Sequence, residues 1–467
     1  MRCLKLRTMG NSWLGCRLWS RSNSSMISHS PLHPEISVIH VMADYGLLSA
    51  STSLCAVRRS FPFSNKVLKG YLYGTGTPPG FGHDLPNTNI MPNISTCILT
   101  SDGPTAKVIW GRQDGSIIVV SHPRTMSGTQ SLPHIRTSSV QQEHDGAVLD
   151  GTWAVDGNAF ITAGSDGRVK VWTVAPFGCA WTSKRHSLGQ RIDAISRVTE
   201  DLANGLIVAA SKSGDLIIFS GFDSLSLNAG DAPLHDIRTL CIPVRTFSTP
   251  DVEPASVTQP MEISTLYFRA SSPTRLTILV CYLNTSQFYR CSVELLLKQV
   301  DVKTFGSAAV GTIRCIQPAF SNVHAEPSFV LVGTQLGIVS IYNWDTTSLS
   351  GNSDIYPASR HVDVFSDAQV TSLALNPFVI VAGSSRGTIT VLDLLTLETL
   401  RSFRAQVTSD VRQIELVGVL LVANVGSRVL AWSADRFISG GKSPGKIKHK
   451  GKQGGHGKWF SKYQSDT

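Results

Sequence analysis

Two short motifs contain residue types that carry out chemistry in enzymes. Gly383-Ser-Ser-Arg-Gly387 fits the G-x-S-x-G pattern of a hydrolase nucleophile elbow, with Ser385 at the nucleophile position. That elbow requires a helix after the serine, whereas alternating β-branched residues follow here. The Gly-rich segment Gly74–Gly80 lacks both a following helix and the Lys-Ser/Thr of a phosphate-binding loop. We therefore interpret the two segments as a turn and a loop.

The histidines and cysteines show no ligand spacing. The 13 His are scattered, with no i, i+4 pair on a predicted helix, and the nine Cys contain no CxxC pair. These patterns predict neither a metal site nor a disulfide scaffold, and they favour a reducing compartment, the cytoplasm or nucleus. No acid pair, catalytic triad or cofactor fingerprint occurs in its required context. The sequence therefore predicts a non-enzymatic protein without a cofactor.

The charge is concentrated at the two ends of the 467-residue chain. Residues 1–30 contain five Arg and Lys and no acid, and residues 440–467 contain seven Lys and one Asp, so the net charge of +9 leaves the middle nearly neutral. We expect 1–30 to be a basic disordered leader, with a mitochondrial transit peptide as the alternative, and 440–467 to be a disordered Lys/Gly-rich tail. No apolar stretch approaches 18 residues, so no membrane-spanning helix is predicted.

A pattern that repeats along the middle of the chain predicts its secondary structure. A short apolar run, a tight turn and an alternating β-branched run recur seven times, with the turns at Gly115, Gly167, Gly214, Ser286, Gly337, Gly387 and Gly426. Each copy indicates a β-hairpin. A hairpin cannot bury its apolar face alone, and repeats near 50 residues with four strands each stack radially. The sequence therefore predicts an all-β chain folded as a β-propeller.

The repeats set the expected boundaries. We assign the propeller to residues 31–439, with a long loop at 61–95 and an insertion at 220–260. Seven hairpins predict seven blades, and Leu47–Val57 either begins an eighth or extends the first. Glu35–Met42 alternates well enough to be the strand that closes the last blade from the N-terminal side.

The segment Glu143–Thr173 resembles a repeat of the WD-repeat propeller family. Its matches to the family's hydrogen-bonded tetrad are His144, Thr162, Asp166 and Trp172. The resemblance implies that these four residues form a buried structural network in which the indole N–H and the imidazole find partners. The other copies keep the strand-turn-strand pattern and lose the tetrad.

The overall layout resembles fungal F-box/WD-repeat proteins, the substrate receptors of SCF ubiquitin ligases. That resemblance implies a protein-interaction scaffold whose propeller binds substrates and whose partners include the SCF adaptor and cullin. The chain departs from the family because residues 1–60 show no helical F-box pattern and no acidic ubiquitin-interacting helix follows the tail. The alternative is an RNA-linked assembly scaffold that makes weak RNA contacts through its basic ends.

Four residues are candidate partner contacts. Arg168, Trp344 and Arg386 lie near predicted blade turns, and Trp459 lies in the Lys-rich tail. Arginine and tryptophan are frequent at protein interfaces, and a tryptophan can also stack on bases. For the first three, solvated loop residues are the alternative interpretation. For the tail, the alternatives are weak RNA contact, with Trp459 stacked on bases, and a solvated linker that leads to a short partner-binding segment, Trp459–Tyr463.

Overall fold

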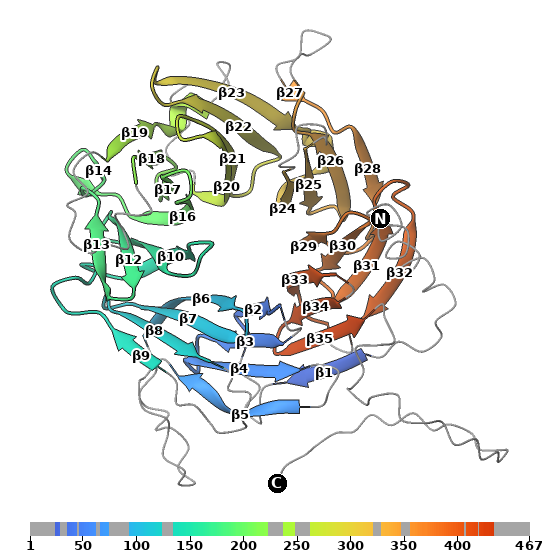
Figure 1. Ribbon diagram of the computed structural model, residues 1–467. Coiled ribbons are helices and arrows are strands. Elements are labelled where there is room, and N and C mark those ends of the chain that lie inside the picture. Colours follow the sequence, from blue (N-terminus) through green and yellow to red (C-terminus); the bar gives the residue numbers. More distant parts are fainter. Residues whose placement is uncertain are drawn as a thin grey trace, which may run out of the picture.

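Short apolar strands joined by tight turns make up nearly all of the regular structure, as alternating β-branched sequences favour. The computed structural model describes residues 24–28, 35–43, 46–61, 66–73, 93–123, 134–222, 237–247, 262–320, 328–346, 355–405, 408–418 and 420–433. Eight sheets of four or five strands, antiparallel except for one short strand, stand side by side around a central axis (Figure 1). The all-β propeller is therefore confirmed, with eight blades.

The first four blades follow one another along the chain. Blade 1 contains β2 (Val38–Val41), β3 (Leu47–Ser51), β4 (Ala56–Phe61) and β5 (Lys66–Tyr73). Blade 2 contains β6 (Ile94–Asp102), β7 (Thr105–Arg112), β8 (Ile117–His122) and β9 (His134–Thr137). Blade 3 contains β10 (Val148–Trp153), β11 (Ala159–Gly164), β12 (Val169–Val174) and β13 (Phe177–Thr182). Blade 4 contains β16 (Ile195–Asp201), β17 (Leu206–Ser211), β18 (Leu216–Ser220) and β19 (Arg238–Ile242).

The remaining blades complete the ring. Blade 5 contains β20 (Ile263–Ser272), β21 (Arg275–Tyr282), β22 (Gln287–Glu294), β23 (Gln299–Gly306) and the parallel β27 (Ile355–Tyr356). Blade 6 contains β24 (Ile313–Ala319), β25 (Phe329–Thr334), β26 (Ile338–Asn343) and β28 (Arg360–Asp363). Blade 7 contains β29 (Val370–Leu375), β30 (Val379–Ser384), β31 (Thr388–Asp393) and β32 (Thr399–Arg404). Blade 8 contains β33 (Val411–Val417), β34 (Leu420–Val425), β35 (Arg428–Ser433) and β1 (Ser24–Ser28).

Four short elements lie outside the blades. They are the hairpin strands β14 (Ser187–Leu188) and β15 (Arg191–Ile192) and the 3₁₀ turns η2 (Val244–Phe247) and η3 (Ala308–Val310). No helix in the described part of the chain is long and apolar enough to cross a membrane.

The eighth blade is closed by a strand from the N-terminal side, but not by the expected one. β1 pairs antiparallel with β35, in a register that sets Met26 opposite Leu430. The predicted closing segment, Glu35–Met42, instead contains β2, the first strand of blade 1. The prediction was wrong because β2 also alternates, and alternation does not distinguish an inner from an outer strand. β1 also places a strand inside residues 1–30, where we expected a disordered leader.

Two expected loops contain outer strands. β5 lies within 61–95 and completes blade 1, and β19 lies within 220–260 and completes blade 4. The residues around β5 are turn-rich and those around β19 are rich in Asp, Ser and Pro, so the composition of both segments predicts loops; β19 also has only one buried residue. Leu47–Val57 contributes β3 and the start of β4 to blade 1, which is the additional blade that brings the count from seven to eight. The tail at 440–467 lies outside the described residues.

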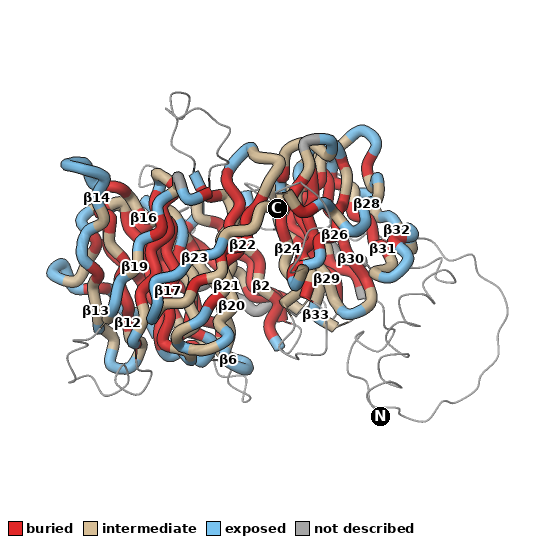
Figure 2. Tube along the Cα trace, turned by 90° about the horizontal axis from the view of Figure 1, so that it is seen from above, coloured by how far each residue is buried: buried red, intermediate tan, exposed pale blue. Residues whose placement is uncertain are grey.

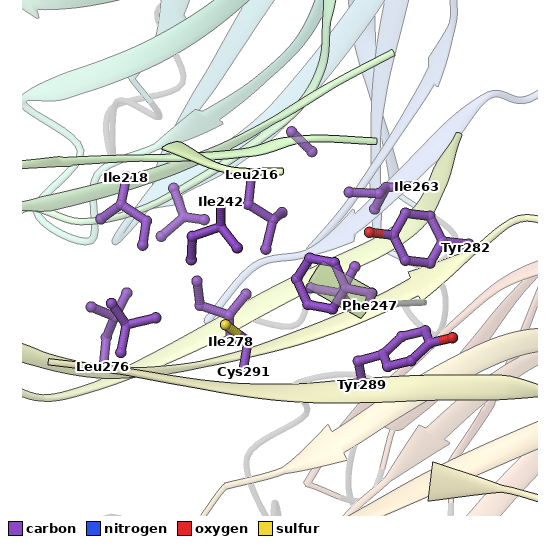
Figure 3. Packing of buried hydrophobic residues seen from close by; sticks show 14 of the residues in the cluster. Leu216, Ile218, Ile242, Phe247, Ile263, Leu276, Ile278, Tyr282, Tyr289 and Cys291 are labelled. Carbon is purple, nitrogen blue, oxygen red and sulfur yellow. The ribbon is translucent and has the colours of Figure 1, made fainter. Parts of the chain in front are cut away.

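Each interface between neighbouring blades encloses a hydrophobic cluster. Figure 3 shows the cluster between blades 4 and 5, where Ile218 and Leu216 face Ile278 and Tyr289. The seam between blades 8 and 1 has its own cluster, which contains Ile39 and Val422 among others. The buried residues run through the middle of the ring's thickness, and the exposed ones lie at its two faces and along outer strands such as β19 (Figure 2). Burial at every seam, rather than one central core, therefore stabilises the ring.

One face of the ring carries both the turns between second and third strands and the connections between blades; we call it the connection face. Hydrogen bonds join each connection to a turn there. The N–H of His186 donates to Gly167 O (2.7 Å), for example, and the N–H of Val364 donates to Gly337 O (3.0 Å). Gly337 has φ +80°, and a Cβ at this position would overlap the carbonyl oxygen of Phe365. The repeated turn glycine is therefore required by the approach of the next connection.

Candidate protein-interaction face

The four residues of the WD-like tetrad form one chain of hydrogen bonds in blade 3. His144 contacts Asp166 through Nδ1 (3.0 Å) and Thr162 through Nε2 (2.9 Å). The indole N–H of Trp172 donates to the hydroxyl of Thr162 (2.8 Å). Asp166 also accepts the backbone N–H of Arg168 (3.1 Å), which fixes the turn between β11 and β12.

The electrostatics of the tetrad favour a structural role. Burial lowers the pKa of His144, so its imidazole is neutral at pH 7 and donates from Nδ1 to Asp166. Burial acts to raise the pKa of Asp166, but hydrogen bonds from His144 and from backbone N–H groups bring that pKa below its usual value. All four side chains are buried, so the His–Asp pair is closed to a substrate. The tetrad therefore holds the turn between β11 and β12, on the connection face, against the strands of blade 3.

All four residues of the hairpin strands β14 and β15 are exposed on the connection face. The hairpin lies in the connection between blades 3 and 4, and its ladder pairs with no blade. Leu188 is 60% exposed and Ile192 is 50% exposed, and Lys184 and Arg191 are exposed beside them. Figure 2 shows β14 as an exposed projection at the rim of the ring. Exposed apolar residues among cations are typical of a protein-binding surface.

Two of the candidate contact residues lie on the connection face at opposite sides of the ring. Arg168 is half-buried in the turn of blade 3, and Arg386 is exposed in the corresponding turn of blade 7. Arg386 forms an ion pair with Asp367 in the preceding connection. Blades 3 and 7 are four positions apart in a ring of eight, so the two arginines belong to separate parts of the face.

Trp344 is not a surface residue, contrary to its interpretation as an exposed contact. It is 3% exposed and packs at the seam between blades 5 and 6, stacked 6.0 Å from Phe305 and tilted 5.2 Å from Phe320. The guanidinium of buried Arg290 donates to its carbonyl oxygen. Trp344 is therefore a core residue because the connection after β26 folds back over blade 5. Trp459 lies outside the described residues.

The serine of the G-x-S-x-G motif lies in the turn between β30 and β31. A strand and not a helix follows it, as expected, and its hydroxyl accepts the backbone N–H of Gln369 (3.2 Å). The motif therefore serves as a blade turn tied to the preceding connection.

The connection face also contains a titratable cluster that sequence analysis did not identify. His186, Asp193 and Asp215 come together at the seam between blades 3 and 4. Interaction with Asp193 raises the pKa of His186, against the opposing effect of burial. Burial acts to raise the pKa of Asp193, but the neighbouring His186 imidazole and the hydrogen bond from Ser213 bring that pKa below its usual value. The spacing of these three residues in the sequence does not predict the cluster. His186 and Asp193 flank the hairpin β14–β15, and Asp215 belongs to the next blade.

Comparison with known proteins adds information on the fold. No protein-family model and no curated protein matches the chain. Among solved structures, the computationally designed Ika8 protein is similar with a TM-score of 0.55 at 15% identity, over 88% of this chain and 98% of that chain. Saccharomyces cerevisiae Sqt1 gives 0.49 at 12% identity, over 71% and 79% of the two chains. The β-propeller domain of Myceliophteria thermophila Cps50 (Swd1) gives 0.44 at 13%, over 73% and 99%. The first of these similarities supports the fold of this chain and leaves its partners open.

Proposed function

We propose that the protein is a non-enzymatic protein-interaction scaffold whose connection face binds other proteins. The β14–β15 hairpin is the observation that carries this proposal. It adds nothing to the sheets of the blades, yet it presents Leu188 and Ile192 to solvent beside Arg191. Apolar residues in a charged surround bind a partner by burial at the centre and by complementary charge at the rim.

Within that role, we propose that the chain is the substrate-binding propeller of an SCF-type ubiquitin-ligase receptor. The support is the resemblance to the fungal F-box/WD-repeat layout, together with an exposed surface of the kind that holds a substrate protein. An RNA-linked assembly scaffold is the second candidate. The observation in its favour is the run of seven Lys with a single Asp in residues 440–467.

Affinity purification of the tagged full-length chain tests both candidates. We expect the SCF adaptor and cullin to co-purify at low and moderate salt and to remain after nuclease treatment. Recovery of ribosomal or RNA-processing proteins that nuclease removes, with no adaptor or cullin, would replace the receptor proposal by the RNA-linked one. Since phosphate contacts weaken steeply with salt, the two salt conditions separate the candidates independently.

A pair of matched variants tests the face. Leu188→Asp with Ile192→Asp places charge on the hairpin, whereas Val155→Asp changes a 99% exposed apolar residue in the turn between β10 and β11, on the opposite face. We expect the hairpin variant to lose its substrate proteins while keeping the adaptor and cullin, and Val155→Asp to keep all of them. Equal losses in the two variants would contradict binding through the connection face.

A further inference from the structure

Three side chains converge at the base of the β14–β15 hairpin. His186 immediately precedes β14, Asp193 immediately follows β15, and Asp215 comes from the turn between β17 and β18 of blade 4. Nε2 of His186 lies 3.5 Å from Oδ2 of Asp193 and 3.7 Å from Oδ2 of Asp215. One ligand atom from each of the three residues lies within 4.8 Å of the other two. The cluster therefore brings the two ends of the hairpin together with a residue of blade 4.

The imidazole of His186 lacks the hydrogen bond that an ordinary His–Asp pair would form. Its Nε2 atom is fully enclosed, yet it has no hydrogen-bond partner among the described residues. A bond between N–H and a carboxylate has a length of about 2.7–3.2 Å. The tetrad provides a reference within the same chain, because Nδ1 of His144 reaches Asp166 at 3.0 Å. Nε2 of His186 therefore lies near two carboxylates without a hydrogen bond to either of them.

The two carboxylates are held in place from outside the cluster. The hydroxyl of Ser213 donates to Oδ2 of Asp193 (2.5 Å), and its backbone N–H donates to Oδ1 (3.2 Å). The N–H of Val244 donates to Oδ1 of Asp215 (2.8 Å), so Oδ2 is left facing His186. Carboxylates that ligate metals are commonly oriented by such outer hydrogen bonds.

The spacing and chemistry of the three atoms fit a metal ion. Ligands at about 2.0–2.2 Å from a tetrahedral ion are separated by about 3.3–3.6 Å. The measured 3.5 and 3.7 Å are close to that range. One imidazole and two carboxylates suit Zn²⁺ or Mn²⁺, whereas Mg²⁺ and Ca²⁺ prefer oxygen ligands alone. A divalent ion would also balance the two carboxylates, whose side chains are only 9% and 12% exposed.

We propose that His186, Asp193 and Asp215 bind one divalent transition-metal ion, of the Zn²⁺ or Mn²⁺ class, that fastens the β14–β15 hairpin to blade 4. Two ligands flank the hairpin and the third belongs to the blade, so the ion sets the direction in which the hairpin projects. The ion is structural in this proposal. It fixes the connection face at the seam where Leu188 and Ile192 are exposed.

Mn²⁺ binding to the EDTA-treated full-length chain tests the proposal. Mn²⁺ is chosen because it avoids thiols, and Cys241 on the adjacent strand β19 is exposed. Electron paramagnetic resonance of free Mn²⁺ should show one ion bound per chain. Asp215→Asn should weaken binding by at least about tenfold, and Ser213→Ala by about 10- to 100-fold through the outer hydrogen bond. Asp145→Asn is the control, since that carboxylate is 84% exposed on the same face.

Three results would overturn the proposal. The first is the absence of stoichiometric Mn²⁺ and Zn²⁺ binding to the wild-type chain, which is a measurement that needs no substitution. The second is unchanged affinity in Asp215→Asn, with folding verified by circular dichroism. The third is an equal loss in Asp145→Asn, which would show diffuse attraction to acidic residues. As an independent measure, Mn²⁺ should raise the melting temperature of the wild-type chain and leave that of Asp215→Asn unchanged.

Discussion

The carboxylate of Glu415, on the inner strand of blade 8, accepts the backbone N–H of Val41, on the inner strand of blade 1, at 2.6 Å. Beside it, the side chain of Gln413 exchanges two hydrogen bonds with the backbone of Ile39, each 2.9 Å long. These residues are separated by 374 positions, and their bonds cross the seam at which the ring closes. The closure therefore depends on the side chains of β33 as well as on the pairing of β1 with β35.

Glu415 should make the stability of the ring depend on pH. Burial raises the pKa of its carboxyl from 4.5 to about 7, so the folded state favours the protonated form. The stabilisation is fully present below pH 4.5 and is lost as the pH rises through 7. We expect Glu415→Gln to be more stable than the wild type by about 1–3 kcal/mol at pH 8, with little difference at pH 5. Urea unfolding at both pH values measures this.

Some pH dependence should remain in that variant. Burial likewise raises the pKa of Glu200, on β16, to about 7. Glu200→Gln should therefore flatten the profile further. A wild-type free energy of unfolding that rises between pH 5 and 8, or that the Glu415 substitution does not alter, would contradict the prediction.

The tetrad should contribute cooperatively to the stability of blade 3. Thr162→Val removes the group that bonds both His144 and Trp172, and Trp172→Phe removes the indole donor while keeping a ring. Each variant should lose about 1–3 kcal/mol of unfolding free energy, because a buried polar group is left without its partner. A double-mutant cycle should give a coupling of about 0.5–3 kcal/mol. Strict additivity would mean that the tetrad does not act as one network.

Two glycine substitutions can separate the free-energy cost of the close backbone contact at a blade turn from the cost of a positive φ. Gly337 and Gly103 both have positive φ, but a Cβ on Gly337 would overlap backbone and a Cβ on Gly103 would meet nothing within 4 Å. Gly103→Ala should therefore cost about 1–2 kcal/mol, from the left-handed backbone alone. Gly337→Ala should cost about 1–3 kcal/mol more, because the connection must shift. Thermal or urea unfolding measures both variants. An equal loss of unfolding free energy in the two would show that the contact between Gly337 and the next connection does not limit the residue at this position.

Closure by β1 predicts the effect of a deletion. Removing residues 1–28 takes away the strand paired with β35 and leaves that strand as an open edge. We expect a marked fall in the melting temperature and an increased tendency to aggregate. Removing residues 440–467 is the control, because the described blades contain no part of that segment. An unchanged melting temperature after the first deletion would contradict closure by β1.

The sequence by itself determined the type of fold. Alternation around Gly167, Gly337 and the other turns specifies hairpins, since a strand has a period of two and a tight turn accepts few residue types. The tetrad could be located because Glu143–Thr173 resembles a WD repeat, in which the members of the tetrad occupy set positions. The outer strands β5 and β19 were missed because each lies in a segment whose other residues favour turns and loops, and β19 has only one buried residue.

Only the tertiary structure decided which residues meet across the seams. β1 rather than β2 closes the ring, Trp344 is buried by the neighbouring blade, and His186 meets Asp215 from a different blade. None of these relationships has a sequence period, because each depends on how two separately folded sheets pack. Local propensity acts over a few residues, whereas packing joins residues dozens to hundreds of positions apart, and no local pattern carries that information.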